Sequence, residues 1–211
     1  MVMALKTFVK ISEVNNLSDA RYCAGMGVDQ LGFNVVPDHP QFVDSEKFKE
    51  IGGWVAGVRF VGELGDQSTD YALEVVRNYK FDLLQTNRVE LLDEFNRLPL
   101  PVILDLNVDD YIDEMALKKV LDYGHGFVEY FLVHSTREEE NPARLQEIMA
   151  LAKRYSIVLG SWVGSHNVDQ LLSTASLAGI ALKGGDEIKP GYKDFDELAG
   201  ILEMIEVEEG Y

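Results

Sequence analysis

Cysteine is almost absent from this chain of 211 residues, because Cys23 is the only one. A single thiol excludes an internal disulfide, and it excludes a zinc cluster built on several cysteines. Cys23 lies in a helical pattern with Ala20, Ala24 and Met26, which favours small core packing over a reactive thiol. We expect a cytoplasmic protein, and we expect neither a metal nor a cofactor.

Lysine and arginine are scarce, with 19 basic against 36 acidic residues and a formal net charge of −17. Nucleic acids and anionic membranes both attract basic residues, so this balance argues against either partner. An acidic exterior can nevertheless surround a locally basic phosphate pocket. The charge therefore leaves a small anionic molecule open as the partner.

Long apolar runs are missing as well. No segment approaches the roughly 18 consecutive apolar residues of a membrane span, and residues 1–6 lack the apolar core of a signal peptide. The chain also contains no low-complexity segment and no linker. Because 46% of the residues are hydrophobic, a chain of this length suits one globular domain over residues 1–211.

Strand-like and helix-like segments alternate along the whole chain, which is the pattern of a parallel sheet covered by helices. We expect strands at residues 7–11, 30–35, 55–60, 81–85, 102–106, 128–133, 156–160 and 180–182. We expect helices at residues 17–26, 68–79, 89–97, 110–122, 142–154 and 167–175, with two more that begin near 44 and 194. Eight units of roughly 26 residues each predict a single-domain (β/α)8 barrel. A doubly wound open sheet would more often use fewer strands, with a glycine fingerprint after the first.

The segment 179–194 is the first candidate for a ligand site. A short apolar strand leads into Lys183 and the pair Gly184-Gly185, and adjacent glycines let backbone N–H groups approach an anion closely. The loops after the last two strands of such a barrel commonly hold a phosphate. A plain turn without a ligand stays open as the alternative. Pro190-Gly191 predicts a turn, and Asp194 predicts the cap of a final amphipathic helix.

The order of these motifs resembles the phosphoribosylanthranilate isomerase family of tryptophan biosynthesis over nearly the whole chain. Residues 9–11 resemble its first strand, and residues 16–37, NLSDARYCAGMGVDQLGFNVVP, resemble its first helix and second strand. Gln85 stands where the family has the Gln of a Gln-Leu-His-Gly strand end. Asn167-Val168 and the stretch 187–194 resemble its last phosphate loop. The resemblance implies a small phosphorylated metabolite as partner, bound by a monomer or homodimer.

The family's reaction, which the resemblance implies, is an Amadori rearrangement of a phosphoribosyl amine to an aminodeoxyribulose phosphate. It needs a general acid and a general base, which the family supplies as an Asp after the sixth strand and a Cys after the first. Here these catalytic positions hold His134 and Ser12. A histidine can act as an acid near neutral pH, but a serine hydroxyl is a far poorer base than a thiolate. Glu13 replaces the family's next Gly, and it could curl inward from a loop.

The positions that the resemblance assigns to substrate and phosphate are Gln41, Gln85, Ser161, Trp162, Lys183, Gly184 and Gly185. Gln41 replaces an Arg that resembles an anthranilate-carboxylate clamp, so a bidentate contact is lost. Ser161-Trp162 replaces a Gly-Gly pair, and the Trp162 side chain could partly fill that half of the phosphate site. The half after the eighth strand keeps Gly185 and gains the cation of Lys183. Ala181 replaces an Asp of the family.

Three hypotheses remain open, because the departures fall at site positions while Gly27, Gly32 and Pro37 match the family. A working enzyme with replaced groups predicts a polar pocket at the strand ends, with His134 and Lys183 within reach of one ligand. A binding module predicts an anion near Gly185 with no base in range, and an interaction protein predicts that Trp162 plugs the mouth. Two further polar residues lie near strand ends: Arg59 and Asp105. Asp105 is expected to pair with a lysine or arginine, and Arg59 has an outward-facing alternative.

Overall fold

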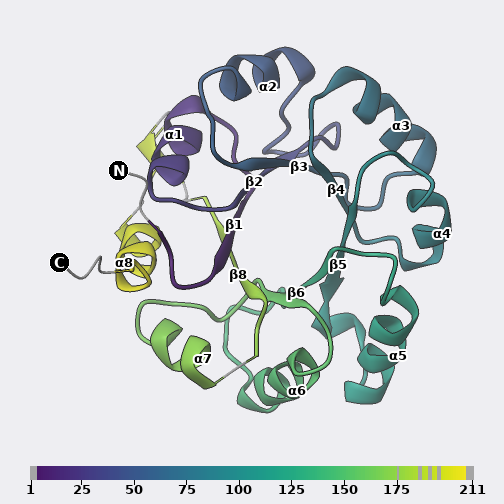
Figure 1. The fold of residues 1–211 in the computed structure, drawn as a ribbon, viewed down its shortest axis with the longest axis vertical. Helices are drawn as coiled ribbons and strands as arrows, with labels where there is room; N and C mark the ends of the chain where they lie inside the picture. The colour runs from purple at the N-terminus through teal and green to yellow at the C-terminus, as the bar shows by residue number, and fades with distance from the viewer. Residues whose placement is uncertain (1–3, 175, 185–186, 190–191, 194–195, 208–211) are drawn as a thin grey trace.

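The chain folds into a closed barrel of eight parallel strands, in which β1 pairs with both β2 and β8 (Figure 1). The computed structural model describes residues 4–174, 176–184, 187–189, 192–193 and 196–207. The strands are β1 Phe8–Ser12, β2 Gln30–Asn34, β3 Arg59–Glu63, β4 Leu83–Thr86, β5 Val102–Asn107, β6 Tyr130–His134, β7 Ile157–Leu159 and β8 Gly179–Lys183. The predicted (β/α)8 barrel is therefore confirmed.

Helices form an outer ring around the strands (Figure 1). They are α1 Leu17–Gly25, α2 Ser45–Gly52, α3 Thr69–Asn78, α4 Leu92–Phe95, α5 Glu114–Gly124, α6 Pro142–Ala152, α7 Val168–Thr174 and α8 Asp196–Met204. Short 3-10 turns, η1 Val89–Leu91 and η2 Val108–Asp110, precede α4 and α5. In the described ranges, no helix is long and apolar enough to cross a membrane.

Local sequence explains where most helices begin. The side chains that accept a hydrogen bond from the first turn of a helix are Asn16, Asp44, Ser68, Asp113 and Asn141. Each satisfies a backbone N–H that has no partner within the helix. The cap of α8 predicted at Asp194 and the turn predicted at Pro190-Gly191 lie outside the described residues. Between β8 and α8, β9 (Glu187–Lys189) and β10 (Tyr192–Lys193) form an antiparallel pair that the sequence analysis missed.

The third strand begins later than the sequence predicted. It begins at Arg59 and ends at Glu63, whereas residues 55–60 were expected. Gly57 has a φ of +85°, which interrupts the extended backbone and delays the strand. Arg59 therefore lies at the start of the strand, where its Nη1 is 2.5 Å from Oε1 of Glu129, and Glu63 takes the end that faces the rim.

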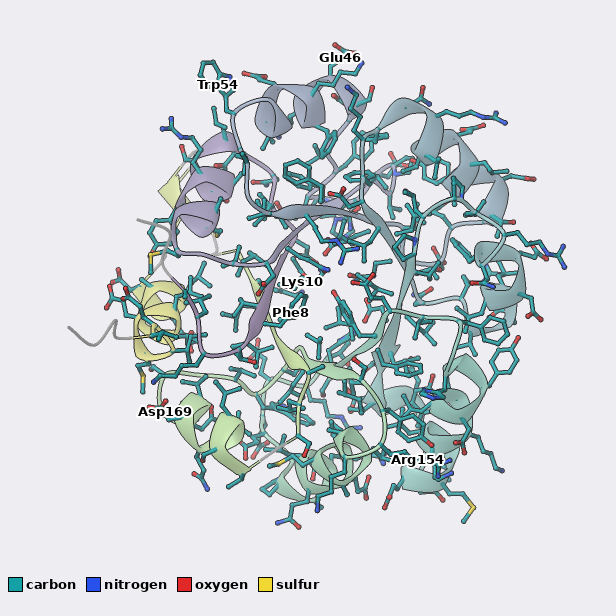
Figure 2. The ribbon with its side chains drawn as sticks, in the orientation of Figure 1. Phe8, Lys10, Glu46, Trp54, Arg154 and Asp169 are labelled. Atoms are coloured by element: carbon teal, nitrogen blue, oxygen red, sulfur yellow. The ribbon has the colours of Figure 1, made fainter. Side chains whose placement is uncertain are left out.

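Two apolar layers meet at the barrel wall. The larger lies between strands and helices and includes Cys23, which is completely buried as packing in the core. The smaller fills the barrel interior and comprises Val61, Leu83, Ile103, Tyr130, Leu132, Val158 and Ala181, with Phe8 packed against it. Figure 2 shows Phe8 and Lys10 pointing from β1 toward the barrel interior, while Trp54 and Glu46 lie on the periphery.

A buried ion pair lies where this interior layer borders the carboxyl ends of the strands. The ammonium of Lys10 is 2.5 Å from Oε1 of Glu63, and the two residues are 0% and 5% exposed. Gly32 makes room for the pair, because a Cβ there would lie 2.1 Å from Oε1 of Glu63 and 2.8 Å from Nζ of Lys10. Moving either group would separate two charges that lack access to water.

We predict that Gly32→Ala lowers the free energy of unfolding by about 3 kcal/mol, the scale expected when a buried pair is disrupted. Chemical denaturation with urea measures the change. Gly25→Ala is the matched control, because a Cβ at Gly25 meets nothing within 4 Å, and it should shift stability by less than about 1 kcal/mol. An unchanged unfolding midpoint for Gly32→Ala would show that the pair tolerates displacement.

Candidate active site

A cavity of about 540 Å³ opens at the carboxyl ends of the strands, the end where barrels of this kind build their sites. Its lining residues are Ser12, Glu13, Asn34, Glu63, Gly65, Gln85, Asp105, Leu132, His134, Ser135, Thr136, Glu138, Gly160, Ser161, Ala181, Leu182 and Lys183. Most come from the ends of β1 to β8 or the loops that follow. The structure thus brings together both predicted catalytic positions and several predicted binding positions.

One wall of the cavity carries a chain of three polar side chains. Nε2 of Gln85 donates to Oδ2 of Asp105 at 2.9 Å, and Oδ1 of Asp105 lies 3.1 Å from Nε2 of His134. Burial disfavours the charged imidazolium and so lowers the pKa of His134, and the charge of Lys183 lowers it as well. The hydrogen bond and charge of Asp105 act in the other direction, and the net result is a pKa above 6.5. Asp105 therefore pairs with His134 here, where a lysine or arginine was expected.

The opposite wall holds the hydroxyl of Ser12. Its Oγ accepts a hydrogen bond from Nζ of Lys10 at 2.6 Å, and the same ammonium is bound to Glu63. One of the two lone pairs of Oγ is thus directed at a buried cation. The second lone pair takes no part in this contact, but a neutral hydroxyl is a far poorer proton acceptor than a thiolate.

Glu13 enters the cavity from the first residue after β1. Its backbone has a φ of +58°, a conformation that costs a residue other than glycine roughly 1–2 kcal/mol. The backbone N–H donates to Oε2 of Glu63 at 3.1 Å, and the carboxylate accepts from Nζ of Lys183 at 3.4 Å. The inward curl that the sequence analysis allowed for Glu13 is therefore confirmed.

The loops after β6 and β7 are fastened to each other at the rim. Oγ of Ser161 accepts from the backbone N–H of Ser135 at 2.8 Å and donates to its carbonyl at 3.0 Å. Oδ2 of Asp109 accepts from the hydroxyls of Ser135 and Thr136. Burial opposes the charge of Asp109, but these hydrogen bonds and Arg137 hold its pKa below the usual value. The hydroxyl of Ser161 is therefore already used in bridging the two loops.

Two residues of the expected binding set lie away from the cavity. Gln41 is absent from its lining, and its side chain accepts a hydrogen bond from Asn15. Trp162 is also absent from the lining, and its indole N–H donates to the carbonyl of Arg137 at 3.2 Å. The Trp162 ring is therefore not among the side chains that line the cavity.

The glycine loop after β8 is described only in part. The backbone N–H of Gly184 donates to the carbonyl of Ser12 at 3.2 Å, and Gly184 is not part of the lining. Gly185 lies outside the described residues. Lys183 lines the cavity with His134, as the enzyme hypothesis expects, and its charge reaches far enough to lower the pKa of His134.

Two carboxylates of the cavity, Glu63 and Glu138, were not expected from the sequence. Glu63 was hidden by the misplaced third strand, since the alternation of residues 59–63 would have put it inside at the rim. Glu138 stands in a charged run, EEE, that reads as a solvated loop. Within the described ranges, no group of three or more potential ligands could hold a metal ion.

Comparisons with known proteins agree with this geometry. A profile of the family N-(5'phosphoribosyl)anthranilate (PRA) isomerase matches residues 9–204. The chain is 24% identical over 204 residues to the N-(5'-phosphoribosyl)anthranilate isomerase of Sulfurihydrogenibium sp. (strain YO3AOP1), covering 93% of this chain and 98% of the relative.

Solved structures give the same fold. The phosphoribosyl anthranilate isomerase from Thermotoga maritima matches with a TM-score of 0.77 at 21% identity, over 93% of this chain and 97% of that chain. A phosphoribosyl anthranilate isomerase in complex with reduced 1-(o-carboxyphenylamino)-1-deoxyribulose 5-phosphate matches with a TM-score of 0.75 at 21% identity, over the same shares of each chain. The profile covers nearly the whole chain, so the chain belongs to the phosphoribosylanthranilate isomerase family.

Proposed function

We propose that this chain is a repurposed member of its family. It holds a small polar metabolite in the cavity at the strand ends, supplies a proton from His134, and turns over phosphoribosylanthranilate very slowly. The observation that carries this proposal is the hydroxyl of Ser12, 2.6 Å from the buried ammonium of Lys10. A cytoplasmic location and a monomeric or homodimeric state stay predictions.

A histidine replaces the general acid of the family's reaction. His134 stands at the position of the family's acid, and Asp105 raises its pKa. An imidazolium that persists near neutral pH can protonate the ring oxygen of a sugar derivative. This supports a site in which the first proton transfer is retained.

The base half is the loss that we propose limits the reaction. Removal of the C2 proton needs an acceptor in reach of the substrate, and Oγ of Ser12 is engaged by Lys10. The expected clamp for the anthranilate carboxylate is also weakened, because Gln41 carries no charge and is bound to Asn15. A family member binds reduced 1-(o-carboxyphenylamino)-1-deoxyribulose 5-phosphate, but in this chain both the proton acceptor and the carboxylate clamp are altered.

The proposal predicts that the wild-type chain turns over phosphoribosylanthranilate only slightly faster than buffer, and that Ser12→Cys raises this rate by about 100-fold. A thiol beside the ammonium of Lys10 would ionise more readily than an isolated one, and a positioned base contributes about 10²–10⁴-fold. Substrate generated in the cuvette, with the loss of its fluorescence followed over time, measures both rates.

Alkylation provides the control for the Ser12→Cys variant. Iodoacetamide should abolish the gained activity, while in the wild-type chain Cys23 is completely buried and should resist modification. Rapid turnover by the wild-type chain would overturn the proposal. In that case Glu13, whose carboxylate lines the cavity, becomes the candidate base, and Glu13→Gln should remove the rate.

The contact between His134 and Asp105 predicts a measurable titration. NMR of the imidazole should give a pKa for His134 above 6.5, and Asp105→Asn should lower this pKa, because the hydrogen bond and charge of Asp105 then no longer oppose burial and Lys183. Because the pKa of His134 is raised in the folded state, its contribution to the free energy of unfolding is complete below pH 6.5. This contribution is lost as the pH rises through the folded-state pKa. Asp70→Asn on α3 makes the same chemical change outside the cavity lining. If it shifts His134 equally, the pairing with Asp105 is not the cause.

A further inference from the structure

We propose that the cavity accepts a small polyhydroxylated molecule that carries an amine and no phosphate. This inference rests on the proposed function, because it takes the cavity at the strand ends as the ligand site. It names the class of molecule that the charges and free hydrogen-bonding groups of the cavity select.

The charge of the cavity is the first argument. Four carboxylates line it, from Glu13, Glu63, Asp105 and Glu138, against the two basic side chains of Lys183 and His134. Each basic group already faces a carboxylate, since Lys183 lies 3.4 Å from Glu13 and His134 lies 3.1 Å from Asp105. The ammonium of Lys10 is similarly engaged by Glu63. A phosphate dianion would meet no unpaired cation in the described part of this cavity, whereas an ammonium group would meet an excess of carboxylates.

A buried acceptor in the cavity, the amide oxygen of Gln85, has no partner within the described residues. Gln85 is 6% exposed and lines the cavity, and its Oε1 has no hydrogen-bond partner within the described residues. The orientation of the amide is fixed, because Nε2 donates to Asp105 at 2.9 Å. Buried polar atoms are nearly always paired in native proteins. A hydroxyl or ammonium group of a ligand would supply the missing donor, and a phosphate dianion would not.

Donors that were expected to bind phosphate are already used in hydrogen bonds within the protein. The N–H of Gly184 is bonded to the carbonyl of Ser12, and the hydroxyl of Ser161 bridges both backbone groups of Ser135. Neutral side-chain donors with remaining capacity in the described lining include the hydroxyl of Ser12 and the amide of Asn34, whose Oδ1 already accepts from Val36. Isolated neutral donors of this kind suit sugar hydroxyls better than a doubly charged group.

Three sugars that differ only at C1 test the inference: 1-amino-1-deoxyfructose, fructose and fructose 1-phosphate. They present a cation, a neutral hydroxyl and a dianion on the same carbon skeleton. Titration calorimetry gives each affinity, and the imidazole NMR signal of His134 reports whether binding occurs in the cavity. We expect the amine to bind about tenfold more tightly than fructose, since a charge-assisted hydrogen bond exceeds a neutral one by about that factor. Fructose 1-phosphate should bind most weakly.

Glu13→Gln sharpens the test, because it frees the cation of Lys183. This variant should weaken binding of the amine and strengthen binding of fructose 1-phosphate. Glu139→Gln is the matched control, since Glu139 carries the same charge and does not line the cavity, and it should leave the order of affinities unchanged. Tighter binding of fructose 1-phosphate to the wild-type chain, or no binding of any of the three below roughly 10 mM, would overturn the inference. Slow turnover of phosphoribosylanthranilate would leave the proposed function standing in either case.

Discussion

The ammonium of Lys10 lies inside a barrel that is filled mostly by apolar side chains, and its ion-pair partner among the described residues is the carboxylate of Glu63. The pair needs the empty space at Gly32, and it fixes both the hydroxyl of Ser12 and the backbone of Glu13. One interaction therefore sets the geometry of a whole side of the rim. Well-packed apolar residues of similar volume would often be as stable, so the pair makes better sense as a support for the site than as a source of stability.

Two rim residues other than glycine have a left-handed backbone conformation. Glu13 and Trp162 have φ values of +58° and +60°, and both stand where the resemblance places a family glycine. Each adopts a conformation that costs roughly 1–2 kcal/mol without glycine. In return, the carboxylate of Glu13 reaches Lys183, and the indole of Trp162 reaches the carbonyl of Arg137. Strain of this kind tends to persist where the surrounding structure fixes a functional loop.

The sequence was sufficient to predict the barrel, because eight strand–helix units and their capping residues leave few other folds. The enzyme hypothesis, one of the three left open by the sequence, predicted that His134 and Lys183 would face one cavity, and both line it. The sequence analysis failed at the third strand, where the apolar run before Gly57 suggested an early start and so concealed Glu63. The directions of the Gln41 and Trp162 side chains could not be predicted either. Each depends on a loop partner, Asn15 or Arg137, that no local sequence pattern reveals.

The hydrogen bonds of the site favour donation of a proton to the substrate over abstraction of a proton from it. His134 is held as a proton donor by a neighbour whose charge favours the imidazolium. Three of the four carboxylates that line the cavity are engaged: Glu63 by Lys10 and a backbone N–H, Asp105 by Gln85 and His134, and Glu13 by Lys183. Each of these contacts takes up part of the acceptor capacity of the carboxylate. The family's rearrangement needs both transfers in succession, so a site that favours donation and hinders abstraction would bind and protonate a sugar derivative more readily than it would complete that reaction.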